Sequence, residues 1–143
     1  ITVEGRRALR AEIQALVVKS GSPQPRRVTN GVDSARVAML LAVLERRAGL
    51  SLSDRDVYVS TVGGMKITEP AADLAIAIAI ASAVKDKPAK QGLAAFGEIS
   101  LSGEIRGVTN PALRQSEAKR LGHKQVVDSS SAQLGAAIAA ALS

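Results

Sequence analysis

Residues 96–106 read FGEISLSGEIR, a segment in which the triplet Gly-Glu-Ile occurs twice, six residues apart. Two short strands joined by a turn at residues 101–103 would account for this repeat. Upstream, residues 56–62 read DVYVSTV and alternate apolar with polar side chains, which predicts another strand that ends at Gly63 and Gly64. Both segments indicate β-structure, and the chain between them decides the fold class.

An apolar run at residues 70–84 separates the two segments. Its isoleucines alternate with alanine, as they would in a strand. The run is nevertheless long and alanine-rich, and it begins with Pro70 shortly before Asp73, two residue types typical of the first turn of a helix. Because apolar residues lie all round such a helix, we expect it to be buried.

An amphipathic helix is predicted before residue 49. Asp33 or Ser34 is expected to cap its N-terminus, and Gly49 is a natural stop at its C-terminus. The apolar residues of this helix recur at i, i+3, i+4 and i+7 and form one face. They are Val37, Leu40, Leu41 and Leu44.

Shorter patterns complete the chain. We expect one or two strands within residues 8–19, a basic loop or strand edge at residues 26–31, a helix from residue 109 to about residue 122, a strand at residues 125–127 and a last helix from residue 131. Helices and strands thus alternate, which predicts one α/β or α+β domain over residues 1–143, with a mixed sheet packed against helices.

The charge of the chain bears on its partners. It carries 19 basic and 13 acidic residues, a net charge of +6, and residues 1–36 hold seven of the basic and three of the acidic ones. This balance is compatible with a phosphate-rich partner, and also with a solvated basic surface that has no such partner. Aromatic residues make up only 1% of the chain, so it offers almost no platform for stacking the bases of a single strand.

Residue types exclude several kinds of site. The absence of cysteine excludes disulfides and thiolate metal sites, and the single histidine, His123, cannot build a zinc site alone. No segment matches the G-x-x-x-x-G-K-[ST] phosphate loop. The longest apolar run, at residues 74–81, is too short to span a bilayer. We therefore expect a cytoplasmic chain that itself holds no metal or nucleotide and contacts no membrane.

Three segments of the sequence resemble a known family. Residues 56–75, with the Gly-Gly turn and the segment EPAADLA, and residues 96–106 resemble the proteolytic domain of Lon. Asp73, Arg106 and residues 32–47 (VDSARVAMLLAVLERR) are more similar to the C-terminal, Lon-protease-like domain of the bacterial RadA (Sms) family of DNA recombination and repair ATPases. The resemblance covers nearly the whole chain. It implies the fold of the Lon proteolytic domain (ribosomal protein S5 domain 2-like).

The resemblance also bears on peptidase chemistry. Lon-type proteases use a Ser-Lys dyad, with the serine at a helix start and the lysine on the helix after the Gly-Glu hairpin. The matching positions of this sequence are Ala71 and Ala112, which supply neither a nucleophile nor a base. We therefore expect no protease activity, and a Lon-type peptidase with another nucleophile is a remote alternative.

For the intact protein, the resemblance implies a hexameric DNA-dependent ATPase that drives branch migration in homologous recombination and DNA repair, extending strand exchange started by RecA. Its zinc finger and RecA-like ATPase motor precede this domain and are not part of residues 1–143. ATP, magnesium and zinc are accordingly expected in that other part. This domain is expected to support the homo-hexameric ring and to bind single- or double-stranded DNA without sequence preference.

Basic side chains are the candidates for DNA contact, through phosphates rather than bases. They are Arg26, Arg27, Arg36, Arg46, Arg47, Lys66 and Arg106. For each of them, a solvated charge or a salt bridge between subunits is the alternative, and a basic residue in the last turn of a helix also complements the helix dipole. The second function considered is therefore a purely structural assembly domain without DNA contact.

Overall fold

The computed structural model of the chain describes residues 2–4, 7–9, 12–21, 23–62, 66–67, 69–88, 93–106, 125–127 and 134–142. Within these ranges the largest sheet has three strands in the order β3-β5-β4. Strand β3 (Ile13–Lys19) runs antiparallel to the central strand β5 (Arg55–Thr61), and β4 (Arg27–Asn30) runs parallel to β5. A parallel pair requires a crossover connection, which helix α1 (Ser34–Arg47) provides between β4 and β5.

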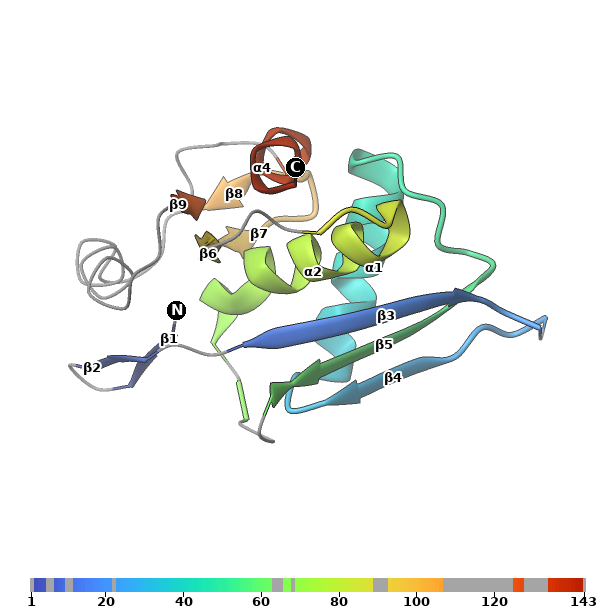
Figure 1. Ribbon diagram of the computed structural model, residues 1–143, viewed down its shortest axis with the longest axis horizontal. Coiled ribbons are helices and arrows are strands. Elements are labelled where there is room, and N and C mark those ends of the chain that lie inside the picture. The colour runs from blue at the N-terminus through green and yellow to red at the C-terminus, as the bar shows by residue number, and fades with distance from the viewer. Residues whose placement is uncertain are drawn as a thin grey trace.

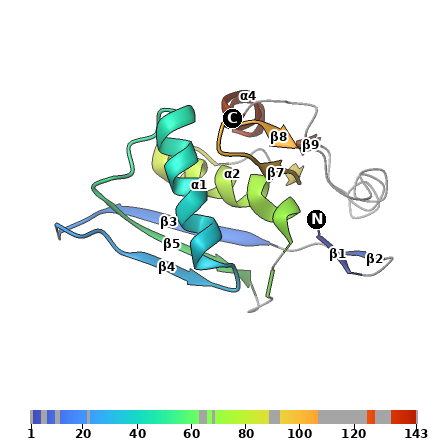
Figure 2. The same ribbon diagram turned by 180° about the vertical axis from the view of Figure 1, so that it is seen from behind.

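Both long helices lie on the same face of this sheet. Helix α1 passes behind the three strands in Figure 1 and in front of them in Figure 2. Helix α2 (Asp73–Lys85), which follows the 3₁₀ turn η2 (Pro70–Ala72), packs beside α1 and against β3. Alternate side chains of β5 are buried beneath these helices, and no helix of the described part of the chain covers the opposite face of the sheet.

The remaining elements are short. They pair as β1 (Thr2–Glu4) with β2 (Arg7–Leu9), antiparallel; β6 (Leu93–Ala95) with β9 (Gln125–Val127), parallel; and β7 (Glu98–Ile99) with β8 (Ile105–Arg106), antiparallel. The last described helix is α4 (Leu134–Ala141), which packs against α2. Of these pairs, β7 and β8 form the predicted hairpin that lies beside the start of α2.

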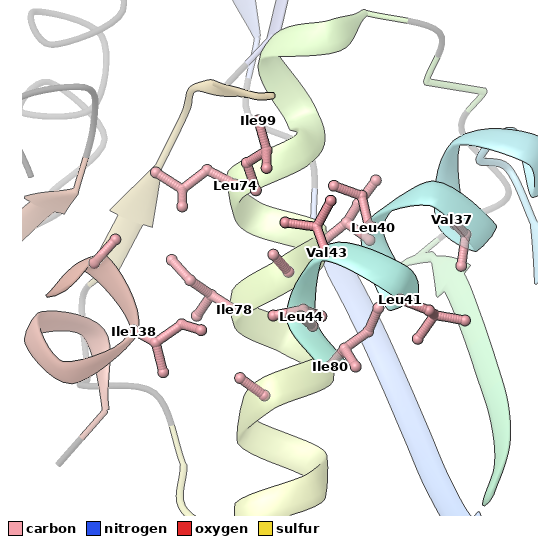
Figure 3. Packing of buried hydrophobic residues seen from close by; sticks show 14 of the residues in the cluster. Val37, Leu40, Leu41, Val43, Leu44, Leu74, Ile78, Ile80, Ile99 and Ile138 are labelled. Carbon is pink, nitrogen blue, oxygen red and sulfur yellow. The ribbon is translucent and has the colours of Figure 1, made fainter. Parts of the chain in front are cut away.

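The hydrophobic core lies between α1, α2 and the sheet. Figure 3 shows the apolar side chains of α1 meeting those of α2, with Ile99 of β7 and Ile138 of α4 completing the cluster. Leu40 and Leu44 of α1 and Leu74 of α2 have no exposed surface. Burial of each such side chain contributes about 1.5–3 kcal/mol relative to leaving it in water. The spacing of apolar residues in α1 therefore fixes which of its faces turns inward.

The apolar run at residues 70–84 is helical, as predicted. Its three isoleucines, Ile76, Ile78 and Ile80, are between 0% and 4% exposed even though they point in different directions round α2. The sheet, α1 and α4 enclose the helix on several sides, so apolar residues are needed all round it. This enclosure explains an alternation that otherwise imitates the periodicity of a strand.

Most of the other predicted elements are also confirmed. The side chain of Asp33 caps α1 by accepting the N–H of Ala35 at 3.2 Å, and the helix ends just before Gly49. The basic segment after residue 25 forms edge strand β4, and the strand at residues 125–127 is present. The helix predicted from residue 109 to about 122 lies outside the described residues. The described chain is thus a mixed α/β structure with a small mixed sheet, which agrees with the α+β class.

Candidate functional site

The position that matches the serine of Lon-type proteases lies in the turn before α2. Ala71 is the middle residue of η2 and is 2% exposed. Its carbonyl oxygen accepts a hydrogen bond from the N–H of Gly97 at 2.8 Å. A methyl group at this position supplies no nucleophile. The matching lysine position, Ala112, lies outside the described residues.

An ion pair joins α1 to the first residue of α2. Nε of Arg36 donates to Oδ1 of Asp73 at 2.7 Å, and Nη2 of the same guanidinium donates to Oδ2. The N–H of Ile99 donates to Oδ2 of Asp73 at 3.1 Å, and Nη2 of Arg36 lies 3.6 Å from Oε1 of Glu98. The side chain of Asp73 is 1% exposed and that of Arg36 is 29% exposed. The pair is therefore buried on its acidic side and reaches solvent on its basic side.

The surroundings of this pair act on both of its charges. Burial raises the pKa of Asp73, and the hydrogen bonds from Arg36 and from the N–H of Ile99 oppose that rise. The hydrogen bond to Asp73 in turn raises the pKa of Arg36. Because a guanidinium stays protonated in proteins, the pair is a structural link and not an acid–base catalyst. Two of the donors of Arg36 are committed to Asp73, which leaves fewer of them for a phosphate.

The β7–β8 hairpin is fixed to α2 and α1 at both of its ends. The N–H of Leu74 donates to the carbonyl oxygen of Gly97 at 3.1 Å, and a Cβ atom on residue 97 would lie only 2.7 Å from Cγ2 of Ile105. At the turn, Gly103 has φ +86° and lies against the stem of Arg47, where a Cβ atom would come within 3.0 Å. The two glycines of the repeated Gly-Glu-Ile triplet are therefore required by close packing at one end and by a left-handed turn at the other.

An open hollow of about 420 Å³ lies between α1 and this hairpin. Its lining residues come from the first turns of α1 and from the hairpin. They are Arg36, Met39, Glu98, Ile99, Ser100, Leu101, Ser102 and Arg106. The Oγ atoms of Ser100 and Ser102 are hydrogen-bonded to each other at 2.9 Å. Guanidinium and hydroxyl groups at one place can donate hydrogen bonds to phosphate oxygens, and Arg106 is the exposed cation among them.

Two of the seven candidate cations, Arg36 and Arg106, thus line the same hollow. Three others, Arg46, Arg47 and Lys66, are exposed. Arg46 and Arg47 lie in the last turn of α1. Lys66 precedes Ile67, whose N–H donates to the carbonyl oxygen of Gly31 in the loop after β4. The structure therefore brings together only part of the predicted set.

Arg27 begins β4 and Arg26 precedes it, at the end of the sheet that carries the loop from β3 (Figure 1). The N–H of Arg26 donates to Oδ1 of Asp56 at 2.7 Å. The guanidinium of Arg27 donates to the carbonyl oxygen of Leu52 at 3.1 Å and to that of Arg55. Arg27 consequently holds the turn before β5 in place, whereas the guanidinium of Arg26 donates no hydrogen bond within the described part of the chain.

The described residues contain no group of three or more His, Cys, Asp or Glu side chains placed to hold a metal ion. His123 lies outside them. Among the described helices, none is long and apolar enough to cross a membrane.

Comparison with known proteins relates this geometry to a family. The family model described as "Subunit ChlI of Mg-chelatase" matches residues 34–131, which include α1, β5, α2 and the β7–β8 hairpin. The chain belongs to the ChlI family. The part that matches this family also contains Arg36, Asp73 and the hollow beside the hairpin.

The ChlI-family chain also has close relatives among curated proteins. It is 49% identical to "DNA repair protein RadA" of Salmonella typhimurium and 48% identical to that of Escherichia coli, in each case over 124 residues that make up 87% of this chain and 27% of the relative. The protein of the same name from Mycobacterium tuberculosis is 48% identical over 122 residues, 85% of this chain and 25% of the relative. The predicted resemblance to the RadA family is therefore confirmed, and the chain spans about a quarter of the length of these relatives.

Two features of the ChlI-family chain were missed by the sequence patterns. Asp73 was interpreted as a first-turn residue and a family marker, but it is also the buried partner of Arg36. The only signal for this was a single carboxylate at the start of an otherwise apolar run. The second feature is a row across the open face of the sheet, in which the partly exposed Tyr58 lies between the exposed Leu16 and Val28. This row can be recognised only once the strand order is known.

Proposed function

We propose that this chain is a non-proteolytic Lon-like domain of a RadA-type DNA repair ATPase, and that it contacts DNA and supports ring assembly. The observation that carries the proposal is the identity of 48–49% to proteins named DNA repair protein RadA over most of the chain. The basic excess of the chain, +6 in total, supports contact with a phosphate backbone. The domain is the C-terminal part of the parent protein in this proposal.

The absence of peptidase activity is part of the proposal. Ala71 stands at the serine position of the Lon pattern and is buried, with its carbonyl group bonded to Gly97. Acyl transfer requires a nucleophile beside a base. Replacement of both dyad residues abolishes acyl transfer, and the surrounding fold can remain unchanged.

In the parent protein, ATP, magnesium and zinc would bind to the part outside this chain, and a RecA-like motor would drive branch migration during homologous recombination, after strand exchange by RecA. A homo-hexameric ring in the cytoplasm would surround the DNA. The Lon-like domain would then contribute arginine contacts to phosphates, which give affinity without sequence preference. Arg106 and Arg46 are exposed and have no side-chain partner in the described part of the chain, which suits that role.

Fluorescence anisotropy of labelled DNA tests this function. Affinity should fall steeply from low to physiological salt and should be equal for unrelated sequences. Arg106→Ala should weaken binding of all sequences alike and reduce the salt slope by about 1. The matched control is Lys87→Ala, which removes the same charge after the end of α2. Absence of binding even at low salt would exclude DNA contact by this domain.

A purely structural assembly domain is the second candidate. The observation that favours it is the exposure of aliphatic side chains on the open face of the sheet, with Leu16 and Val28 exposed by 58% and 48%. This function predicts oligomers whose size depends on protein concentration and no affinity for DNA at moderate salt. Sedimentation velocity over a range of concentrations separates it from the first candidate.

A further inference from the structure

The open face of the β3-β5-β4 sheet carries the only tyrosine of the chain. In the register of the strands, Leu16 of β3 and Val28 of β4 are the neighbours of Tyr58 on β5, one on either side. Leu16 and Val28 are exposed by 58% and 48%, and Tyr58 is partly exposed. A partly exposed aromatic ring between two aliphatic side chains therefore lies across the centre of a face that no described helix covers.

The row on one side of this apolar row is polar, and the row on the other side is mixed. On one side, Gln14, Ser60 and Asn30 lie next to one another across the three strands and present amide and hydroxyl groups. These groups both donate and accept hydrogen bonds, as the edges of nucleic-acid bases require. On the other side, Val18 is paired with Asp56, and Oδ1 of Asp56 is bonded to the N–H of Arg26.

The cation at this end of the open face is Arg26, which is exposed, precedes β4 and lies next to Asp56. Lys19 ends β3 on the same side of the strand as Ile13, Ala15 and Val17, which pack on the core, so it does not belong to the open face. A strand of nucleic acid laid on the sheet would place a phosphate near Arg26. The order along the face is thus a polar row, an apolar row with an aromatic ring, and a mixed row that ends in a cation.

The size of the face favours bases over a protein partner. Three strands spaced about 4.8 Å apart, with residues about 3.3 Å apart, give a face roughly 10 Å wide and at most about 20 Å long. A stable protein interface buries about 800 Å² on each partner, which is several times this area. Sheet platforms that bind single strands stack two or three bases on their aromatic residues, which matches the available space.

We infer that this open face binds two or three unpaired bases of single-stranded DNA, with Tyr58 as the stacking residue and with Arg26 placed for a flanking phosphate. The inference rests on the proposed DNA-contacting function and specifies where the DNA binds and that it is single-stranded. Duplex DNA should bind this face poorly, because the faces of its bases are already stacked on one another. The scarcity of aromatic residues in the sequence does not oppose this, because a single well-placed ring is enough for one base.

The chain contains one tyrosine and no tryptophan, so its intrinsic fluorescence reports on Tyr58 alone. Titration of the chain with oligothymidylate of about ten nucleotides, a usual length for one binding site, should quench this emission. A duplex of the same length should quench it much less. A tyrosine amide in the same titration measures the quenching that does not depend on binding.

Variants of Tyr58 test the stacking itself by anisotropy of labelled oligothymidylate. Tyr58→Ala should weaken binding by roughly 5- to 150-fold, the range expected for the loss of one stacked base. Tyr58→Phe keeps the ring and should bind within about twofold of the unaltered chain. Circular dichroism of both variants checks that they fold. If Tyr58→Ala does not fold, the comparison of Tyr58→Phe with the unaltered chain keeps the test valid.

The possible results separate the inference from the function on which it rests. Salt-sensitive DNA binding without a change of tyrosine emission would overturn the inference and leave DNA contact by the arginines intact. Absence of any DNA binding would overturn both. Emission that changes with protein concentration in the absence of DNA would show that a second copy of the chain covers this face, which also overturns the inference.

Discussion

Arg36 and Asp73 connect the first turn of α1 to the first residue of α2 through two hydrogen bonds, of which the one from Nε to Oδ1 measures 2.7 Å. The same carboxylate accepts the N–H of Ile99, so the β7–β8 hairpin is attached at the same point. Three elements that are distant in sequence thus meet at one buried charge. Removal of any one donor leaves that charge less well compensated.

Arg36→Ala should destabilise the fold by about 3 kcal/mol, because it leaves the carboxylate of Asp73 buried without its ion-pair partner. We expect the lower end of the range for buried pairs, since Arg36 itself reaches solvent. Urea denaturation at neutral pH measures the loss. Arg46→Ala, on the exposed end of the same helix, is the control and should change stability by less than about 0.5 kcal/mol.

The cost of Arg36→Ala should depend on pH. Burial raises the pKa of Asp73, and the variant lacks the guanidinium that opposes this rise. The folded variant then binds a proton more tightly than the unfolded chain, so its stability is lost as the pH rises through the raised pKa. The deficit should therefore shrink as the pH falls through the raised pKa of Asp73. The double variant with Asp73→Asn should lack this change, and a deficit that does not shrink in acid would contradict the account.

Gly97→Ala should destabilise the chain by about 1–3 kcal/mol, because the new methyl group would lie 2.7 Å from Cγ2 of Ile105 and force β8 away from the segment before β7. Thermal denaturation measures the effect. Gly21→Ala is the matched control, since no atom lies within 4 Å of a Cβ at that position. Equal melting temperatures for the two variants would show that the hairpin is not packed as described.

Local patterns in the sequence were enough to predict the main helices and the hairpin. The apolar period and the capping residue of α1 act within a few residues, and both are confirmed by burial and by the bond from Asp33. The repeated Gly-Glu-Ile triplet predicted β7 and β8 because each copy of the triplet contributes to one of the two strands. In each case the deciding interactions are between residues close in sequence.

The missed features depend on contacts between distant residues. Arg36 and Asp73 are separated by 37 positions, and their contact follows from how α1 lies against α2. Their residue types alone do not predict this, because Arg36 has the same local surroundings as a solvated arginine. The row that contains Tyr58 likewise requires β5 to lie between an antiparallel and a parallel neighbour. Alternation within one strand cannot predict which strands flank it.

Asp56 should titrate below the usual range of an aspartate. The hydrogen bond from the N–H of Arg26 lowers the pKa of this exposed carboxyl. A lowered pKa in the folded state contributes stability that is present above the pKa of the unfolded chain and is lost as the pH falls through the folded value. The difference in stability between the unaltered chain and Asp56→Asn should therefore disappear in acid. Carboxyl chemical shifts followed by NMR give the pKa directly, and an ordinary value would contradict the assigned hydrogen bond.

Arg26 and Arg27 are adjacent in sequence, and their replacement should have different effects. The guanidinium of Arg27 donates to the carbonyl oxygens of Leu52 and Arg55, so Arg27→Ala leaves two acceptors of the turn before β5 without their donor. We expect a loss of about 1 kcal/mol or more in the free energy of unfolding.

Arg26→Ala removes a side chain that makes no hydrogen bond among the described residues, while the main-chain bond to Asp56 is kept. Stability should change by less than about 0.5 kcal/mol, and the salt slope of DNA binding should fall by about 1. Urea denaturation and anisotropy on the same two variants separate the roles. Equal stability of the two would mean that Arg27 does not hold the turn, and it would make both arginines equally suitable as phosphate contacts.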